Sequence, residues 1–200
     1  MCRRFVSRII LLCTIQFLLC FQVLSQDTDT IDPSGVWSNH EGTLSLLLTG
    51  DALSFSYSSV FGEDAHICSG AGVAGLEGQN VYHNVDEQGT IAFEISNDKV
   101  RMYVVEGIPS FCGAGWMGAT FNRNRFTPPK RVKVKANKSR FYVVMPSPPW
   151  ERKGYVVAGN VVEVVPVNHD DAEQYVLARY RGKHAFSVGL LLKNTLSGLK

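Results

Sequence analysis

Two short cysteine-glycine segments nearly repeat each other in this chain and limit what it can fold into. They span residues 68–75 and 112–118, and each places a cysteine just before a Gly-Ala-Gly-x-x-Gly run. Glycine lacks a Cβ atom, so such runs permit close approach of two backbones or a positive φ. Because no other cysteine follows residue 20, we predict two β-segments joined at a crowded corner by a disulfide between Cys68 and Cys112.

The first 25 residues have the composition of a secretory signal peptide. Three arginines precede an apolar run over residues 9–24, and Ser25 ends a small-residue cleavage site. The apolar run is shorter than the ~20 residues of a membrane-spanning helix. An uncleaved anchor, or a lipid anchor on a leader cysteine, is the alternative. We therefore expect a periplasmic or secreted protein with no transmembrane segment after residues 1–25 are removed.

Charge divides the rest of the chain at Pro128-Pro129. Residues 26–127 contain 13 acidic and four basic residues, whereas residues 128–200 contain 13 basic and five acidic ones. This asymmetry predicts an acidic domain over 26–127 and a basic domain over 128–200. The two halves either attract each other or present two binding surfaces, one for a basic protein and one for an anionic polymer. No nucleic-acid partner is expected for an exported protein.

The acidic half alternates apolar and polar residues with the period of a β-strand. Leucines alternate with serine or threonine over residues 43–49, a Gly-Asp turn follows, and aromatic residues alternate with serines over 53–58. This pattern predicts a β-hairpin with one buried face. Further strands are expected at 81–85, 91–95, 100–104 and 119–123. No segment shows capped helical periodicity, so we predict an antiparallel β-sandwich or small barrel with one disulfide.

No residue pattern in the chain indicates catalysis. Both glycine runs match Gly-x-Gly-x-x-Gly, but neither is followed by a helix that would bind a dinucleotide phosphate. His66 is placed to activate Cys68 as a nucleophile, yet an exported cysteine with one available mate is expected to be oxidised. The five histidines lack metal-ligand spacing. We predict a protein that is not an enzyme and has no catalytic residue, metal or cofactor.

Two predicted loops, at residues 58–64 and 106–111, mix acidic and aromatic side chains. Binding residues are often carried by loops on a rigid scaffold. The alternative is an ordinary connection with a partly buried phenylalanine. The loops predict a surface that enters the cleft of a basic enzyme, with these candidate partner-binding residues: Phe61, Glu63, Asp64, Glu106 and Phe111.

The basic half resembles a bacterial SH3-like domain over residues 130–196. The resemblance is carried by an aromatic strand at 141–145, then an aliphatic hairpin around Gly159-Asn160. Strands are also expected at 174–180 and 184–192. Members of this family usually carry Gly-Trp in their later strands, where this chain has Tyr175 and Gly189-Leu190. The resemblance implies an SH3-like barrel that binds peptidoglycan or another anionic envelope polymer.

A basic stripe begins this half of the chain. Alternate members of the stripe share one face of a strand. Such a stripe either protects an edge strand from aggregation or binds an anionic polymer. The stripe and candidate anionic-polymer site consists of Lys130, Arg131, Lys133, Lys135, Lys138 and Arg140.

These observations predict an all-β, exported binding protein. The first hypothesis is an inhibitor or immunity protein that blocks a cell-wall-degrading enzyme or toxin, because small exported β-proteins with one disulfide resemble lysozyme inhibitors in general plan. The second is an envelope-anchoring module that uses the SH3-like domain. A hydrolase with a free thiol is the third.

Overall fold

The computed structural model describes residues 31–113, 115–144, 150–168, 173–183 and 185–199. These residues form two antiparallel β-sheets and two short 3-10 turns, η1 (Arg123–Arg125) and η2 (Lys193–Thr195), and they contain no α-helix. The all-β prediction is therefore confirmed. The predicted signal peptide lies outside the described residues. No helix in the described ranges is long and apolar enough to cross a membrane.

The first sheet has nine strands and is a nearly closed barrel, which confirms the barrel alternative. The strand order is β8-β7-β6-β5-β4-β3-β2-β1-β9. Across the opening between β1 and β8, the Asn39 side-chain amide donates a hydrogen bond to the Thr120 carbonyl at 3.2 Å. The strands are β1 (Gly35–Ser38), β2 (Gly42–Thr49), β3 (Ala52–Phe61), β4 (His66–Gly78), β5 (Val81–Val85), β6 (Gly89–Ile95), β7 (Lys99–Gly107), β8 (Gly118–Asn122) and β9 (Phe126–Thr127).

Aromatic and aliphatic side chains fill the interior of this barrel. The predicted hairpin forms as β2 and β3, with Leu48 opposite Leu53 beside the turn. Its alternate residues Leu44, Leu46 and Phe55 point inward and are fully buried. The same core contains Trp37, Tyr57, Tyr82, Phe93 and Phe121.

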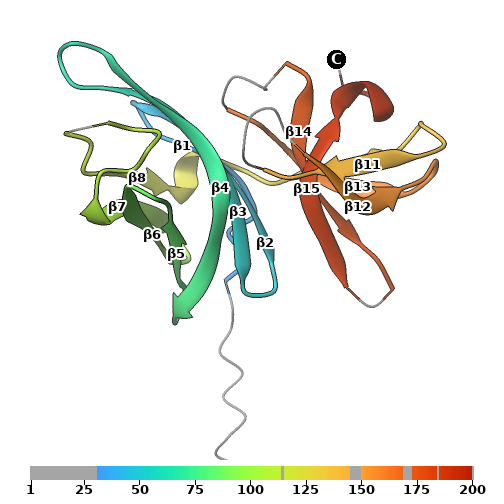
Figure 1. Ribbon diagram of the computed structural model, residues 1–200, viewed down its shortest axis with the longest axis horizontal. Helices are drawn as coiled ribbons and strands as arrows, with labels where there is room; N and C mark the ends of the chain where they lie inside the picture. The colour runs from blue at the N-terminus through green and yellow to red at the C-terminus, as the bar shows by residue number, and fades with distance from the viewer. Residues whose placement is uncertain (1–30, 114, 145–149, 169–172, 184, 200) are drawn as a thin grey trace, which may run out of the picture. The chain divides into compact units, whose positions relative to one another are not determined.

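The longest strand, β4, contains the first glycine run and includes the β-segment predicted at residues 68–75. It has 13 residues and curves around the barrel (Figure 1). Gly70 and Gly72 make room for aromatic rings, because a Cβ atom at Gly70 would collide with Phe111 and one at Gly72 would lie 2.9 Å from Phe55. The glycines therefore accommodate side chains of the core, where the sequence suggested a second backbone.

The second sheet has six strands in the order β10-β13-β14-β15-β11-β12. The hairpin predicted around Gly159-Asn160 is wrong, since β12 pairs with β11 whereas β13 pairs with β10 and β14. The chain does turn there. Val156 before the turn and Val162 after it belong to the same hydrophobic cluster, so the turn connects two strands that pack against one core. The strands are β10 (Lys130–Lys133), β11 (Ser139–Tyr142), β12 (Glu151–Val156), β13 (Val161–Pro166), β14 (Tyr175–Arg181) and β15 (Phe186–Leu192).

The β2–β3 hairpin is buried on both faces, contrary to the prediction of one buried face. Its outward serines Ser45, Ser54 and Ser56 are 0%, 0% and 1% exposed. The second sheet covers them, because outward residues of the first sheet share a hydrophobic cluster with β13, β14 and β15. This shared cluster includes Leu47, Ala71, Val165, Leu177 and Leu190.

Asn168, just after β13, provides the polar contacts of this interface. Its side-chain amide donates to the Ser45 hydroxyl at 2.9 Å and to the Ser56 carbonyl at 3.2 Å. Its backbone N–H donates to the Ser56 hydroxyl at 2.8 Å, and its carbonyl accepts from the Ser69 hydroxyl at 3.3 Å. Ser45 and Ser56, which an isolated hairpin would expose to water, are thus hydrogen-bonded inside the protein.

Arg179 on β14 provides a second polar link. Its guanidinium donates to the Ser34 hydroxyl at 3.0 Å and to the Leu48 carbonyl. It also forms ion pairs with Asp32 at 3.3 Å and Glu163 at 2.8 Å. The Arg179 side chain is 11% exposed, so these partners compensate for the removal of its charge from water.

The charge boundary coincides with the boundary between the sheets, since β9 ends at Thr127 and β10 begins at Lys130. Residues 31–200 nevertheless form one compact unit. The division into two domains at residue 128 stays a prediction.

We expect Asn168→Ala to lower the free energy of unfolding by about 1–3 kcal/mol, because it removes the amide group that satisfies the buried Ser45 hydroxyl. Chemical denaturation measures this loss. The matched control is Asn84→Ala, whose exposed amide donates to one carbonyl and should contribute less than about 1 kcal/mol. Equal effects of the two substitutions would contradict the role given to Asn168.

Candidate functional site

Four connections lie together at one end of the barrel. In an antiparallel sheet whose strands follow in sequence, alternate connections lie at the same end. These connections and their flanking strand ends, residues 38–42, 58–69, 84–90 and 104–118, are here called the disulfide end. They include both loops in which the sequence predicted partner-binding residues.

Main-chain hydrogen bonds and a disulfide tie these connections to one another. The Ser69 N–H donates to the Phe111 carbonyl at 3.1 Å. The Ile108 N–H donates to the Gln88 carbonyl at 3.0 Å, and the Val60 N–H donates to the Glu41 carbonyl at 3.0 Å. The loop backbones are therefore held in one arrangement.

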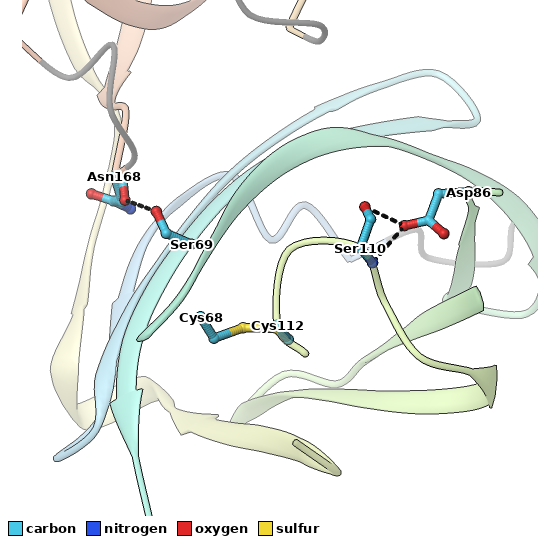
Figure 2. Close-up of a disulfide and its surroundings, with 6 residues drawn as sticks. All are labelled: Cys68, Ser69, Asp86, Ser110, Cys112 and Asn168. Carbon is cyan, nitrogen blue, oxygen red and sulfur yellow. Dashed lines mark hydrogen bonds between the residues drawn. A yellow bond between two sulfur atoms is a disulfide. The ribbon is translucent and has the colours of Figure 1, made fainter. Parts of the chain in front are cut away.

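The predicted disulfide between Cys68 and Cys112 is confirmed (Figure 2). It attaches β4 to the connection between β7 and β8, and both cysteines are buried. Neither sulfur is a free thiol in this state, so the nucleophile interpretation has no support. The His66 ring lies against Phe61, with 5.6 Å between the ring centroids.

Asp86 fixes the same connection from the other side. Its carboxylate accepts hydrogen bonds from the Ser110 N–H at 3.1 Å and the Ser110 hydroxyl at 2.8 Å (Figure 2). The N–H groups of Gln88 and Gly89 also donate to it. Partial burial acts to raise the pKa of Asp86, but these hydrogen bonds outweigh it and hold the pKa below its ordinary value.

Trp116 closes the core beneath this connection. It is 3% exposed, and its ring centroid lies 5.7 Å from that of Tyr57. Burial raises the pKa of the Tyr57 phenol, which therefore stays neutral at ordinary pH. The connection between β7 and β8 is thus part of the barrel core on one side and part of the surface on the other.

The structure separates the candidate partner-binding residues into two groups. Glu63, Asp64 and Glu106 are exposed at the disulfide end. Phe61 and Phe111 are partly buried and pack against the barrel core. The two aromatic rings therefore support the loops, and the carboxylates face solvent.

Most of the apolar surface of the disulfide end was missed by the sequence analysis. Ile67, Val85 and Met117 are 72%, 71% and 77% exposed. The full set of exposed large apolar residues there is Val60, Ile67, Val85, Val105, Ile108 and Met117. The signal that finds them is topological: successive antiparallel strands place every second connection at one end, even when its residues are far apart in sequence.

The charge of the disulfide end is of one sign. Its described residues include no lysine or arginine. Four basic residues lie toward the opposite end: Lys99 and Arg101 begin β7, and Arg123 and Arg125 lie on η1, directly after β8. The carboxylates of the disulfide end are Glu41, Glu63, Asp64, Asp86, Glu87 and Glu106.

The predicted basic stripe does not form one continuous face. Arg131 lies on the edge strand β10, whereas Arg140 lies on β11 and pairs with Glu151 at 3.0 Å. The Lys138 ammonium lies 4.6 Å from the ring centroid of Tyr155. Its members therefore occupy separate strands of the second sheet.

Within the part of the chain that the structure describes, no group of three or more histidine, cysteine, aspartate or glutamate side chains is arranged to hold a metal ion. Neither glycine run is followed by a helix: the first lies in β4, and the second ends at Gly118, the first residue of β8. No protein-family model, curated protein or solved structure matches this chain.

We expect replacement of both Cys68 and Cys112 by serine to lower the free energy of unfolding by about 4 kcal/mol, because the disulfide closes a loop with a sequence separation of 44 residues. Denaturation of the oxidised protein and of the double variant measures the difference. A loss below about 1 kcal/mol would show that the other contacts at this end are sufficient.

We expect Ser110→Ala to raise the pKa of Asp86 toward its ordinary value, because the variant lacks the hydroxyl donor. A carboxylate with a lowered pKa stabilises the fold above the unfolded value of 3.8, and this stability is lost as pH falls through the folded value. The variant should therefore have a smaller contribution above pH 3.8, and the loss of that contribution should be complete at a higher pH than in the unmodified protein.

A side-chain carboxyl NMR titration of Asp86 measures this change. Ser96→Ala is the matched control, since the Ser96 hydroxyl lowers the pKa of Asp98. The control should shift Asp98 and leave Asp86 unchanged. An Asp86 pKa that is the same with and without Ser110 would refute the assignment.

Proposed function

We propose that this protein is an exported, non-enzymatic inhibitor or immunity protein that binds a basic cell-wall-degrading enzyme or toxin through the disulfide end. The observation that carries the proposal is the joint presence there of six carboxylates and six exposed apolar side chains, without a lysine or arginine among the described residues. Carboxylates together with exposed apolar side chains indicate a protein partner more directly than either kind of residue alone.

Each component has a separate role in binding. Exposed apolar residues such as Ile67 and Met117 lose contact with water in a complex and supply affinity. The surrounding carboxylates attract a positively charged partner and speed association. Because the connections are already tied to one another, little conformational entropy is lost when the partner binds.

The export part of the proposal rests on the leader and the cysteines. Residues 1–25 have the composition of a signal peptide, and the Cys68–Cys112 disulfide suits an oxidising compartment. The inhibited enzyme would then be encountered in the periplasm or outside the cell. We also propose that residues 128–200 form a second domain of SH3-like type.

Envelope anchoring is the second candidate function. It is favoured by β10, an edge strand on which Lys130, Arg131 and Lys133 are exposed. None of these three side chains forms an ion pair with any described residue. An SH3-like domain with this edge would bind peptidoglycan or another anionic envelope polymer while the disulfide end stays free for a protein.

A pull-down with residues 26–200 from envelope extracts tests the first function. We expect one near-stoichiometric basic hydrolase or toxin to be retained in high salt. The double variant Glu63→Lys/Asp64→Lys should weaken its binding at least tenfold, because two attractive charges become repulsive. Calorimetry with the purified partner measures the change.

The matched control is Asp51→Lys/Glu77→Lys, which makes the same charge change at exposed positions outside the disulfide end and should alter binding less than about twofold. Ile67→Ser tests the apolar component. Equal weakening by both charge variants would indicate a general charge effect. Recovery of wall polymer alone, released by salt, would favour anchoring over inhibition.

A further inference from the structure

A cleft of about 440 Å³ lies on the second sheet, apart from the disulfide end. It is lined by three arginines, Arg131, Arg179 and Arg181, together with Phe186 and the carboxylates of Asp32 and Glu163. Strand register fixes this arrangement, since Glu163 lies opposite both Arg131 and Arg179, and Arg181 lies opposite Phe186. The lining residues therefore stand mainly on paired strands.

Arg179 forms ion pairs with both carboxylates of the cleft. Its guanidinium lies 3.3 Å from the Asp32 carboxylate and 2.8 Å from the Glu163 carboxylate. This arginine is nearly buried and belongs to the interface between the sheets. Arg179 balances one of the two negative charges, and with Arg131 and Arg181 the cleft has three positive and two negative groups, a net formal charge of +1.

The other two arginines have no such partner. Arg131 and Arg181 are exposed, and neither forms an ion pair with any described residue. The Arg181 guanidinium carbon lies 5.6 Å from the ring centroid of Phe186, a cation–π contact that restricts its position. Two positively charged groups held in one cleft repel each other, and a bound anion would relieve that repulsion.

We propose that this cleft binds an oxyanion, the carboxylate or phosphate group of a small ligand, between Arg131 and Arg181. A guanidinium presents paired N–H donors that match the two oxygens of either group. The proposal is independent of the protein-binding function, which uses other residues. It also differs from the basic stripe, because only Arg131 belongs to both.

A second hollow shares Phe186 with this cleft. It has a volume of about 310 Å³ and includes Arg152 and Lys153. The Arg152 guanidinium is fixed there by donating to the Val188 carbonyl at 2.6 Å. A ligand with a second anionic group would meet further positive charge in this direction.

Calorimetric titration of residues 26–200 tests the proposal with three probes: inorganic phosphate, glycerol 3-phosphate and N-acetylmuramic acid. We expect at least one probe to bind, and Arg131→Gln/Arg181→Gln to weaken its binding at least tenfold. Tighter binding of glycerol 3-phosphate would identify a phosphate ester as the source of the anion. Tighter binding of N-acetylmuramic acid would identify a carboxylated sugar.

Arg125→Gln is the matched control, because Arg125 is exposed on η1 and lines neither hollow. It should leave binding unchanged. The thermal unfolding midpoint of each variant shows whether the fold is retained, and Arg131→Gln alone provides a milder change. No binding by any probe, or binding that all folded variants retain, would overturn the proposal.

Discussion

Hydrogen bonding across a buried serine face is the interaction on which the arrangement of this protein depends. The outer surface of the β2–β3 hairpin carries hydroxyl groups that are unfavourable to bury without partners. Asn168 supplies partners for two of these serines, and Arg179 adds a charged link at the edge. With Ser45 and Ser56 hydrogen-bonded in this way, Leu47 and Ala71 join the apolar cluster of the second sheet.

The disulfide end is held together by its own contacts. Its connections are short or cross-linked, and they use their aromatic residues to complete the core of the barrel. What is left for the surface is mainly carboxylates and aliphatic side chains, held on a backbone with little freedom. The same connections therefore stabilise the barrel with one set of side chains and present another set to solvent.

The sequence was most informative where local pattern decides structure. Alternation identified the β2–β3 hairpin, and the strand at 81–85 has the predicted bounds. The disulfide followed from the cysteine count. By contrast, a β-segment was predicted at residues 68–75, but the full length of β4 was not, because glycine has low intrinsic preference for strands. Here the aromatic rings of Phe55 and Phe111 require the space, a reason that is visible only in three dimensions.

Non-local pairing explains the remaining differences. Gly159-Asn160 is a correct turn signal, but a turn does not determine which strands form a ladder. The serine face gave a polar pattern typical of solvent exposure, and only the position of the second sheet shows that it is buried. The exposed apolar residues of the disulfide end were overlooked for the same reason, since each is unremarkable within its own segment.

The serine face also couples the two halves of the chain. Ser56 and Asn168 are 112 positions apart and yet share a buried hydrogen bond. Replacing Ser56 removes the acceptor of the Asn168 N–H, and replacing Asn168 removes the amide that donates to the Ser56 carbonyl. The effect of a replacement in one half therefore depends on the residue present in the other. Exchanging one half of the chain without the other would therefore separate Ser56 and Ser45 from Asn168 and leave buried hydrogen-bonding groups without their partners.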